Sequence, residues 1–261
     1  KPGDEVISTN DLYGGSYRLF TRIFEGLGIK FRFVSMANTN DVEQQINENT
    51  KMIWVETPTN PMMNIIDIEA MSQISKKHNL LLAVDNTFAT PYLQQPLELG
   101  ADIVMHSATK YLGGHSDVVM GGLVVKDQNL AEKLYFIQNA SGAISGPQDS
   151  FLVLRGIKTL HLRMQRHCEN GEAVAKFLKA HPKVEKVFWP GFEYHPNHQI
   201  AKKQMKDFGG MVSFTTAEGT LESAVKFVEN LRVFTLAESL GGVESLRSEE
   251  HTSELQSPLD I

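Results

Sequence analysis

The sequence contains almost no cysteine, no long apolar run and no excess of positive charge. Cys168 is the single cysteine among 261 residues, which excludes an internal disulfide and fits a reducing compartment, so we expect a cytoplasmic protein. No apolar run approaches the roughly 18 residues of a membrane span, which predicts no membrane partner. A formal net charge of −6 argues against a nucleic-acid partner, because proteins that bind nucleic acid present basic surfaces.

Beyond these absences, the composition is that of a globular protein. Hydrophobic residues make up 41% of the chain and charged residues 21%, and the length suits one large domain or one domain with part of a second. Residues 1–7 are typical of a turn that enters a strand, not of a signal peptide. Since the chain does not begin with Met, we expect it to start inside a domain.

Short apolar runs alternate with helical patterns through the first half of the chain. Strands are expected at residues 4–8, 29–34, 51–56, 80–84, 101–105 and 120–125, interspersed with helices at 16–26, 40–49, 67–78 and 129–140. Such alternation with short connections predicts βαβ units and a mostly parallel sheet, an α/β fold. Residues 148–181 contain few helix breakers and predict one long helix or two. Strands at 184–188, 211–215 and 232–236, with a helix at 221–231, predict a smaller α+β part.

Reactive side chains follow two of the apolar runs. Ser107, Thr109 and Lys110 come just after one run, and Asp85 closes another. Open α/β sheets bind their ligands outside the carboxyl ends of the strands. A lysine amine kept partly neutral by burial forms Schiff bases, and an aspartate suits a protonated pyridine nitrogen. The pattern therefore favours a bound cationic heterocycle that carries a phosphate.

Each candidate also has an ordinary structural interpretation. Lys110 suits a surface lysine after a strand, and Asp85 suits a cap of the next turn. Tyr13 lies in a loop with Gly14 and Gly15, where its ring can stack on a heteroaromatic ring and its phenol can move a proton, or where it is simply a half-buried loop residue. Arg18 can bind a carboxylate or phosphate, or remain a solvated helix charge.

Seven motifs occur in order along the chain, and together they are typical of one enzyme family. They are Tyr13-Gly14-Gly15, Glu56-Thr57-Pro58-Thr59-Asn60-Pro61, Val84-Asp85-Asn86-Thr87-Phe88, Ser107-Ala108-Thr109-Lys110-Tyr111, Gly114-His115-Ser116-Asp117, Leu154-Arg155-Gly156 and Leu236-Ala237-Glu238-Ser239-Leu240-Gly241-Gly242. Through them the chain resembles the Cys/Met-metabolism enzymes that depend on pyridoxal 5′-phosphate (PLP), the trans-sulfuration enzymes, and most closely their cystathionine γ-lyase and γ-synthase branches. The resemblance extends to about residue 246. It implies the fold-type I, aminotransferase-like α/β architecture.

The resemblance implies a role for each cofactor residue. Lys110 would form the Schiff base with PLP and later shuttle protons, and Asp85 would pair with the ring nitrogen. Tyr13 would stack on the ring and help to activate the substrate amine. Ser107 and Thr109 would bind the phosphate.

A second group of residues is implied around the substrate. Thr87 would support the ring or the Asp85 carboxylate, and Asn60 and Ser239 would lie on the side of the ring hydroxyl and the substrate carboxylate. Arg18 and Glu238 would contact the substrate, with Glu238 facing the distal ammonium group of cystathionine. The methionine-cleaving branch usually has cysteine where this chain has Gly15, which together with Glu238 favours cystathionine.

The expected reaction is therefore γ-elimination of cystathionine to cysteine, 2-oxobutanoate and ammonia, with γ-replacement of an acyl-homoserine by cysteine as the alternative. The expected assembly is a homotetramer built from dimers. By resemblance, residues 1–147 would form a large cofactor-binding domain without its N-terminal part, 148–181 a helical connection and 182–246 a partial C-terminal domain. A glycine-rich phosphate loop and the arginine that clamps the substrate carboxylate are expected outside this chain, which would then be an inactive fragment. Residues 247–261 lack core periodicity and resemble translated sequencing adaptor, so a non-native tail is expected there.

Two other kinds of site match part of the sequence pattern. Ser107-x-x-Lys110 matches the nucleophile motif of serine acyltransferases, but that motif opens a helix, and its companion motifs are only approximated by Ser116-Asp117-Val118 and Lys158-Thr159-Leu160. Among nine histidines, His161 with His167 and His195 with His198 lack carboxylate or cysteine company at ligand spacing. No metal site is expected. An inactive subunit or interaction piece remains a third, non-enzymatic possibility.

Overall fold

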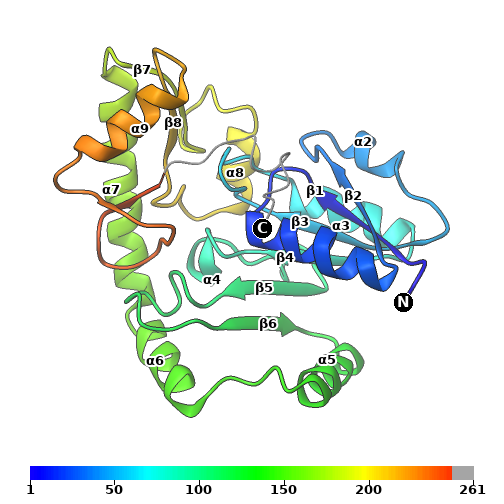
Figure 1. Cartoon of the computed structure of the whole chain (residues 1–261). Helices are drawn as coiled ribbons and strands as arrows, with labels where there is room; N and C mark the ends of the chain where they lie inside the picture. Colours follow the sequence, from blue (N-terminus) through cyan, green and yellow to red (C-terminus); the bar gives the residue numbers. More distant parts are fainter. Residues whose placement is uncertain (249–261) are drawn as a thin grey trace.

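A six-stranded sheet forms the centre of the computed structural model, which describes residues 1–248 (Figure 1). The strand order is β2-β1-β3-β4-β5-β6, and each neighbouring pair is parallel except β5 with β6, which is antiparallel. The strands are β1 (Glu5–Thr9), β2 (Lys30–Val34), β3 (Thr50–Glu56), β4 (Leu81–Asp85), β5 (Ile103–Ser107) and β6 (Gly121–Val125). The predicted mostly parallel sheet is confirmed. The predicted tail lies outside the described residues from residue 249 onward.

Helices flank the sheet and lead away from it. They are α1 (Gly14–Arg18), which continues as a π-helix (Leu19–Phe24) and a 3-10 turn (Glu25–Leu27), α2 (Thr39–Glu43), α3 (Ile68–Lys77), α4 (Thr90–Leu93), α5 (Gln128–Ser141), α6 (Pro147–Ile157), α7 (Leu160–Ala180), α8 (His198–Gln204) and α9 (Leu221–Asn230). The predicted connection at 148–181 is two helices, α6 and α7, and α7 runs from α6 toward α9 (Figure 1). None of the helices described is long and apolar enough to cross a membrane.

The period-2 pattern of the strands separates the two faces of the sheet. In β3, Ile53 and Val55 are fully buried and belong to an apolar cluster that includes residues of α3 such as Met71. α3 begins where the Asp67 side chain accepts a hydrogen bond from the backbone N–H of Ala70 at 2.9 Å, because this cap satisfies an N–H that has no partner within the helix. One face of the sheet is therefore the main hydrophobic core.

Aromatic and apolar side chains cover the opposite face. Phe20, in the π-helix, stacks on Phe31 of β2 with ring centroids 4.5 Å apart and meets Trp54 of β3 edge-on at 5.5 Å. Farther along, Tyr111 is buried in a second apolar cluster with Met164 of α7. This face also carries Glu56 and Asp85, because both follow the inward-facing core residues by one position.

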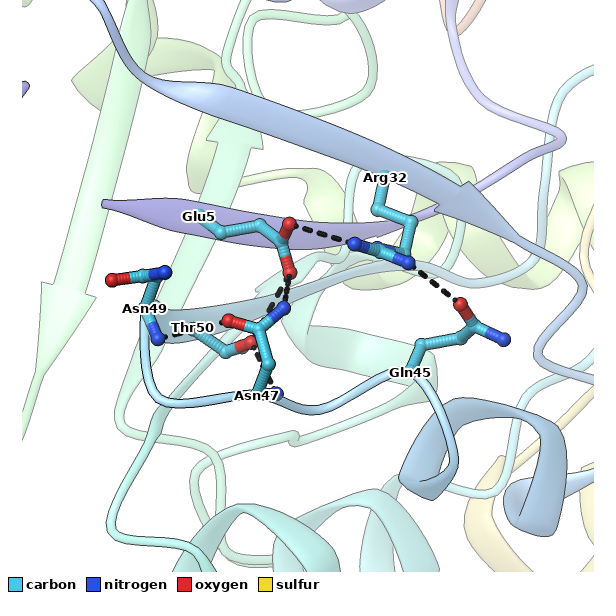
Figure 2. Close-up of polar contacts among 6 residues, drawn as sticks. All are labelled: Glu5, Arg32, Gln45, Asn47, Asn49 and Thr50. Carbon is cyan, nitrogen blue, oxygen red and sulfur yellow. Dashed lines mark hydrogen bonds and ion pairs between the residues drawn. The ribbon is translucent and has the colours of Figure 1, made fainter. Parts of the chain in front are cut away.

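Another carboxyl group, that of Glu5, is buried at the amino ends of the strands. Glu5 in β1 accepts hydrogen bonds from Asn47 at 2.7 Å, from Thr50 at 3.2 Å and from the Arg32 guanidinium at 3.0 Å, as Figure 2 shows. Arg32 also donates to Gln45 at 3.0 Å. This network ties β1 to β2 and β3 at the end of the sheet opposite to Asp85.

Two elements differ from the sequence prediction. The helix expected at 40–49 ends at Glu43, and its cap is the Asn38 side chain, which accepts from the backbone N–H of Asn40. The strand expected at 232–236 shortens to β9 (Thr235–Leu236), which pairs with β10 (Leu246–Arg247) and not with the antiparallel pair β7 (Val184–Phe188) and β8 (Ser213–Thr216). The second difference arises from a pairing partner, β10, that no local pattern specifies.

Candidate active site

Three strands bring their polar ends to one edge of the sheet. In register, Glu56 of β3 lies beside Asp85 of β4, and Asp85 lies beside Met105 of β5. Lys110 follows β5 by one turn, in which its backbone N–H donates to the Ser107 carbonyl at 3.1 Å. Because carboxyl ends of parallel strands meet at one edge, the lysine and both carboxyl groups converge.

A cleft of about 1970 Å³ opens at this edge. Nine of the ten predicted site residues line it, namely Tyr13, Asn60, Asp85, Thr87, Ser107, Thr109, Lys110, Glu238 and Ser239. Arg18 is exposed and is not among the described residues that line the cleft. Arg18 is the last residue of α1, whereas Tyr13 is the cap residue that precedes the helix.

Asp85 is held by the residue that follows it by two positions. One of its carboxyl oxygens accepts from the Thr87 backbone N–H at 3.0 Å and from the Thr87 hydroxyl at 2.6 Å. The same hydroxyl accepts from the backbone N–H of Ser107 at 2.9 Å, so Thr87 joins the ends of β4 and β5. Burial raises the pKa of Asp85 to about 6, although these two hydrogen bonds act to lower it. The buried site therefore disfavours the charged carboxylate in the ligand-free protein.

Glu56 was not predicted as a site residue, although it also lines the cleft. Its two oxygens accept from two backbone amides, that of Tyr13 at 2.9 Å and that of Asn60 at 3.1 Å. Burial, and then the neighbouring charge of Asp85, raise the pKa of Glu56 well above its usual range. The available sequence signal was its position: like Asp85, Glu56 ends a short apolar run just before a turn.

A distant loop completes the wall around the lysine. The Nζ atom of Lys110 lies 3.3 Å from the hydroxyl of Ser239, which is 129 positions away in the chain. Gly241 in the same loop has φ of +83°, and a Cβ there would lie 2.5 Å from the backbone nitrogen of Tyr111. Only glycine permits this backbone conformation at so close an approach. The loop thereby brings Glu238 and Ser239 to the cleft.

The hydroxyl of Thr109 is engaged by backbone. It accepts from the N–H of Met120 at 3.0 Å and donates to the carbonyl of Met120 at 3.4 Å, just before β6. Thr109 therefore joins the lysine segment to the next strand. Its predicted phosphate contact remains a prediction, as does that of Ser107.

The alternative sites have little support in the geometry. Ser107 is the last residue of a strand and does not open a helix, and neither Ser116 nor Lys158 is among the described residues that line the cleft. His195 and His198 are buried, and their ring nitrogens lie 3.1 Å and 2.8 Å from the carbonyl oxygens of Met63 and Pro190. Within residues 1–248, no cluster of three or more His, Cys, Asp and Glu side chains could hold a metal ion.

Known proteins resemble this chain closely. Cystathionine beta-lyase of Lactococcus lactis subsp. cremoris is 56% identical over 245 residues, which cover 94% of this chain and 64% of the relative. Cystathionine gamma-lyase of Dictyostelium discoideum is 51% identical, over 94% of this chain and 63% of its own. The crystal structure of metB from Corynebacterium glutamicum superposes with a TM-score of 0.95 at 50% identity, over 98% of this chain and 66% of that one. The chain thus spans slightly less than two thirds of each of these relatives.

One family model covers nearly the whole chain. It describes the Cys/Met metabolism PLP-dependent enzymes and matches residues 1–257. The match includes all the strand ends that form the cleft. The chain therefore belongs to the Cys/Met metabolism family of PLP-dependent enzymes.

Proposed function

We propose that this chain is part of a PLP-dependent trans-sulfuration enzyme, and that the whole protein cleaves cystathionine at its γ-carbon to cysteine, 2-oxobutanoate and ammonia. The observation that carries the proposal is that Lys110, Asp85 and Glu238 line one cleft with Tyr13. An amine, a buried acid, an aromatic ring and an outer carboxylate are the groups that such a reaction uses.

The residues present fit PLP. Burial raises the pKa of the Asp85 carboxyl. A cation bound beside this carboxyl would stabilise its charged form and so lower the pKa again. The protonated ring nitrogen of PLP is such a cation, and Lys110 in the same cleft is the amine that binds its aldehyde. When bound, PLP supplies an electron sink for the bond that breaks at the α-carbon of the substrate.

The roles proposed for the chain follow from these groups. Lys110 binds the cofactor, and its Nζ then takes and returns protons at the substrate carbons. Asp85 holds the proton on the ring nitrogen. The Tyr13 ring orients the cofactor by stacking, and its phenolic oxygen moves a proton on the substrate amine. The Ser239 hydroxyl, 3.3 Å from the Nζ of Lys110, orients that amine.

Remaining roles concern the phosphate and the substrate. Ser107 and Thr109 are proposed to bind phosphate oxygens, and Asn60 and Thr87 to support the ring. Glu238 would bind the distal ammonium of cystathionine, as a carboxylate suits a cation in a partly enclosed cleft. Arg18, exposed outside the cleft lining, would reach the substrate only after a change in the α1 segment. The proposed assembly is a cytoplasmic homotetramer of dimers.

A second candidate is β-elimination, favoured by the 56% identity to the Lactococcus protein named cystathionine beta-lyase. It uses the same lysine, acid and aromatic ring, and differs in which carbon–sulfur bond of cystathionine is broken. γ-Replacement of an acyl-homoserine by cysteine, which shares the motifs, is the third.

Product analysis of the full-length protein separates these reactions. From cystathionine, γ-elimination yields cysteine and 2-oxobutanoate, whereas β-elimination yields homocysteine and pyruvate. Supplied with acyl-homoserine and cysteine, a synthase makes cystathionine. We expect 2-oxobutanoate from the full-length protein and no thiol from this chain alone. Pyruvate as the main keto acid would overturn the γ-lyase proposal, and thiol release by this chain would overturn its predicted inactivity.

A further inference from the structure

Glu56 lies in the cleft, yet none of the roles above uses it. We propose that Glu56 is a positioning residue that joins the segment carrying Tyr13 to the segment carrying Asn60 and so sets both beside Asp85. This inference rests on the proposed function, because it concerns where the cofactor residues stand.

The hydrogen bonds of Glu56 give the first argument. Its Oε2 accepts from the backbone N–H of Tyr13, 43 positions away, and its Oε1 accepts from the backbone N–H of Asn60. The two segments follow different strands, β1 and β3. One carboxyl group therefore holds two loops at a fixed separation, with one oxygen for each loop.

The exposure of Tyr13 gives the second argument. Its side chain is 49% exposed, so core packing alone does not fix the ring. The residue stands at the N-cap position of α1, but its side chain makes no capping hydrogen bond to the helix. The bond from its N–H to the Glu56 carboxyl is thus a principal restraint on where the ring is presented to the cleft.

The chemistry of the pair gives the third argument. Glu56 lies beside Asp85 in register, so two acidic groups are buried side by side, which is unfavourable for both when charged. Glutamine or leucine would fill the same space without burying a second acidic group. A carboxyl group, unlike an amide or an alkyl group, can present an acceptor oxygen to each of the two backbone N–H donors.

The experiment compares substitutions at two equally buried glutamates of the full-length protein. Glu56→Gln keeps one acceptor oxygen and turns an NH₂ toward the other amide, so one loop is released. Glu56→Asp keeps the carboxyl group but is one methylene too short to reach both loops, and serves if the glutamine variant folds poorly. Glu5→Gln is the matched control, because Glu5 is also 5% exposed but lies at the opposite end of the sheet.

Two readouts decide the matter. For Glu56→Gln we expect amide hydrogen exchange of the cofactor-free protein to accelerate at least tenfold in peptides covering residues 10–16 or 57–63, and the PLP dissociation constant to rise about tenfold. For Glu5→Gln we expect a lower thermal midpoint with both quantities unchanged.

Unchanged exchange and PLP affinity in both Glu56 variants would overturn the proposal. Failure of the unsubstituted protein to bind PLP would refute the proposed function instead, while the exchange readout would still decide whether Glu56 holds the two loops.

Discussion

Glu5 and Glu56 are equally buried, each 5% exposed, but they lie at opposite ends of the same sheet and have different neighbours. Around Glu5, the guanidinium of Arg32 and two neutral donors meet the carboxylate (Figure 2). Around Glu56, two backbone amides donate, and the adjacent side chain in register is the acid Asp85. One end of the sheet neutralises its buried charge within the chain, and the other places two acids together.

The difference distinguishes a structural carboxylate from a site that favours a cationic ligand. At the Glu56 end, burial outweighs the donors, and the pKa values of Glu56 and Asp85 are both raised. Perturbed carboxyl groups in a cleft are typical of functional sites, where stability of the ligand-free protein is lower than it would otherwise be. Substitutions at each end of the sheet test whether a change at one end leaves the other end unaffected.

The largest effect is expected from Lys110→Ala in the full-length protein. Loss of the amine that we propose binds the cofactor and moves protons should reduce turnover by about 10³-fold or more, and borohydride should no longer fix a PLP adduct on the peptide of residues 107–112. The control is Lys126→Ala, because Lys126 is an exposed lysine paired with Glu98. An adduct that persists on another lysine would contradict the assignment of Lys110.

The next effect is a gain in stability from Asp85→Asn in the cofactor-free protein. Because the folded pKa of Asp85 is raised from 3.8 to about 6, the folded state binds more protons than the unfolded state between these pH values. The contribution of Asp85 to the free energy of unfolding therefore falls as pH rises through this window, by at most about 3 kcal/mol. Asparagine has no such proton to lose and retains the acceptor for Thr87.

Urea unfolding at pH 8 and pH 4 measures this difference. Asp85→Asn should be the more stable protein at pH 8, and the gap should close toward pH 4. PLP affinity should fall at the same time, since the variant has no charge to pair with the ring nitrogen. Equal stability of the two proteins at pH 8 would indicate that burying the charged Asp85 carboxylate does not destabilise the fold.

A smaller effect is expected at the other end of the sheet. Arg32→Ala removes the cation from the Glu5 network and should lower the free energy of unfolding by about 1–2 kcal/mol, a reduced value because Arg32 is 44% exposed. Lys30→Ala, an exposed position on the same strand, is the control and should change it by less than about 0.5 kcal/mol. PLP affinity should be unchanged in both. A loss of PLP affinity in Arg32→Ala would show that the two ends are coupled.

Local sequence patterns were sufficient to predict the strands that carry the site residues, but not to predict which face of every helix is buried. The strands ending at Asp85 and Ser107 were predicted within two residues of their observed bounds, since a short apolar run before a polar cluster is a local signal. The apolar spacing at 148–181 was misleading in part. Met164 is fully buried, whereas Leu154 is 65% exposed, because the helix breaks at Lys158 and Thr159 and α6 and α7 turn different faces inward.

By itself, the sequence determined the alternating strands and helices, the mostly parallel sheet and the convergence of Lys110 and Asp85, because these follow from apolar periodicity and from the shared direction of parallel strands. Only the tertiary structure decided that Arg18 lies outside the cleft lining and that Ser239 meets Lys110 across 129 positions. It also decided that Glu56 joins two loops. These contacts depend on helix rotation, loop packing and strand register, which bring together residues whose separation in the chain carries no local signal.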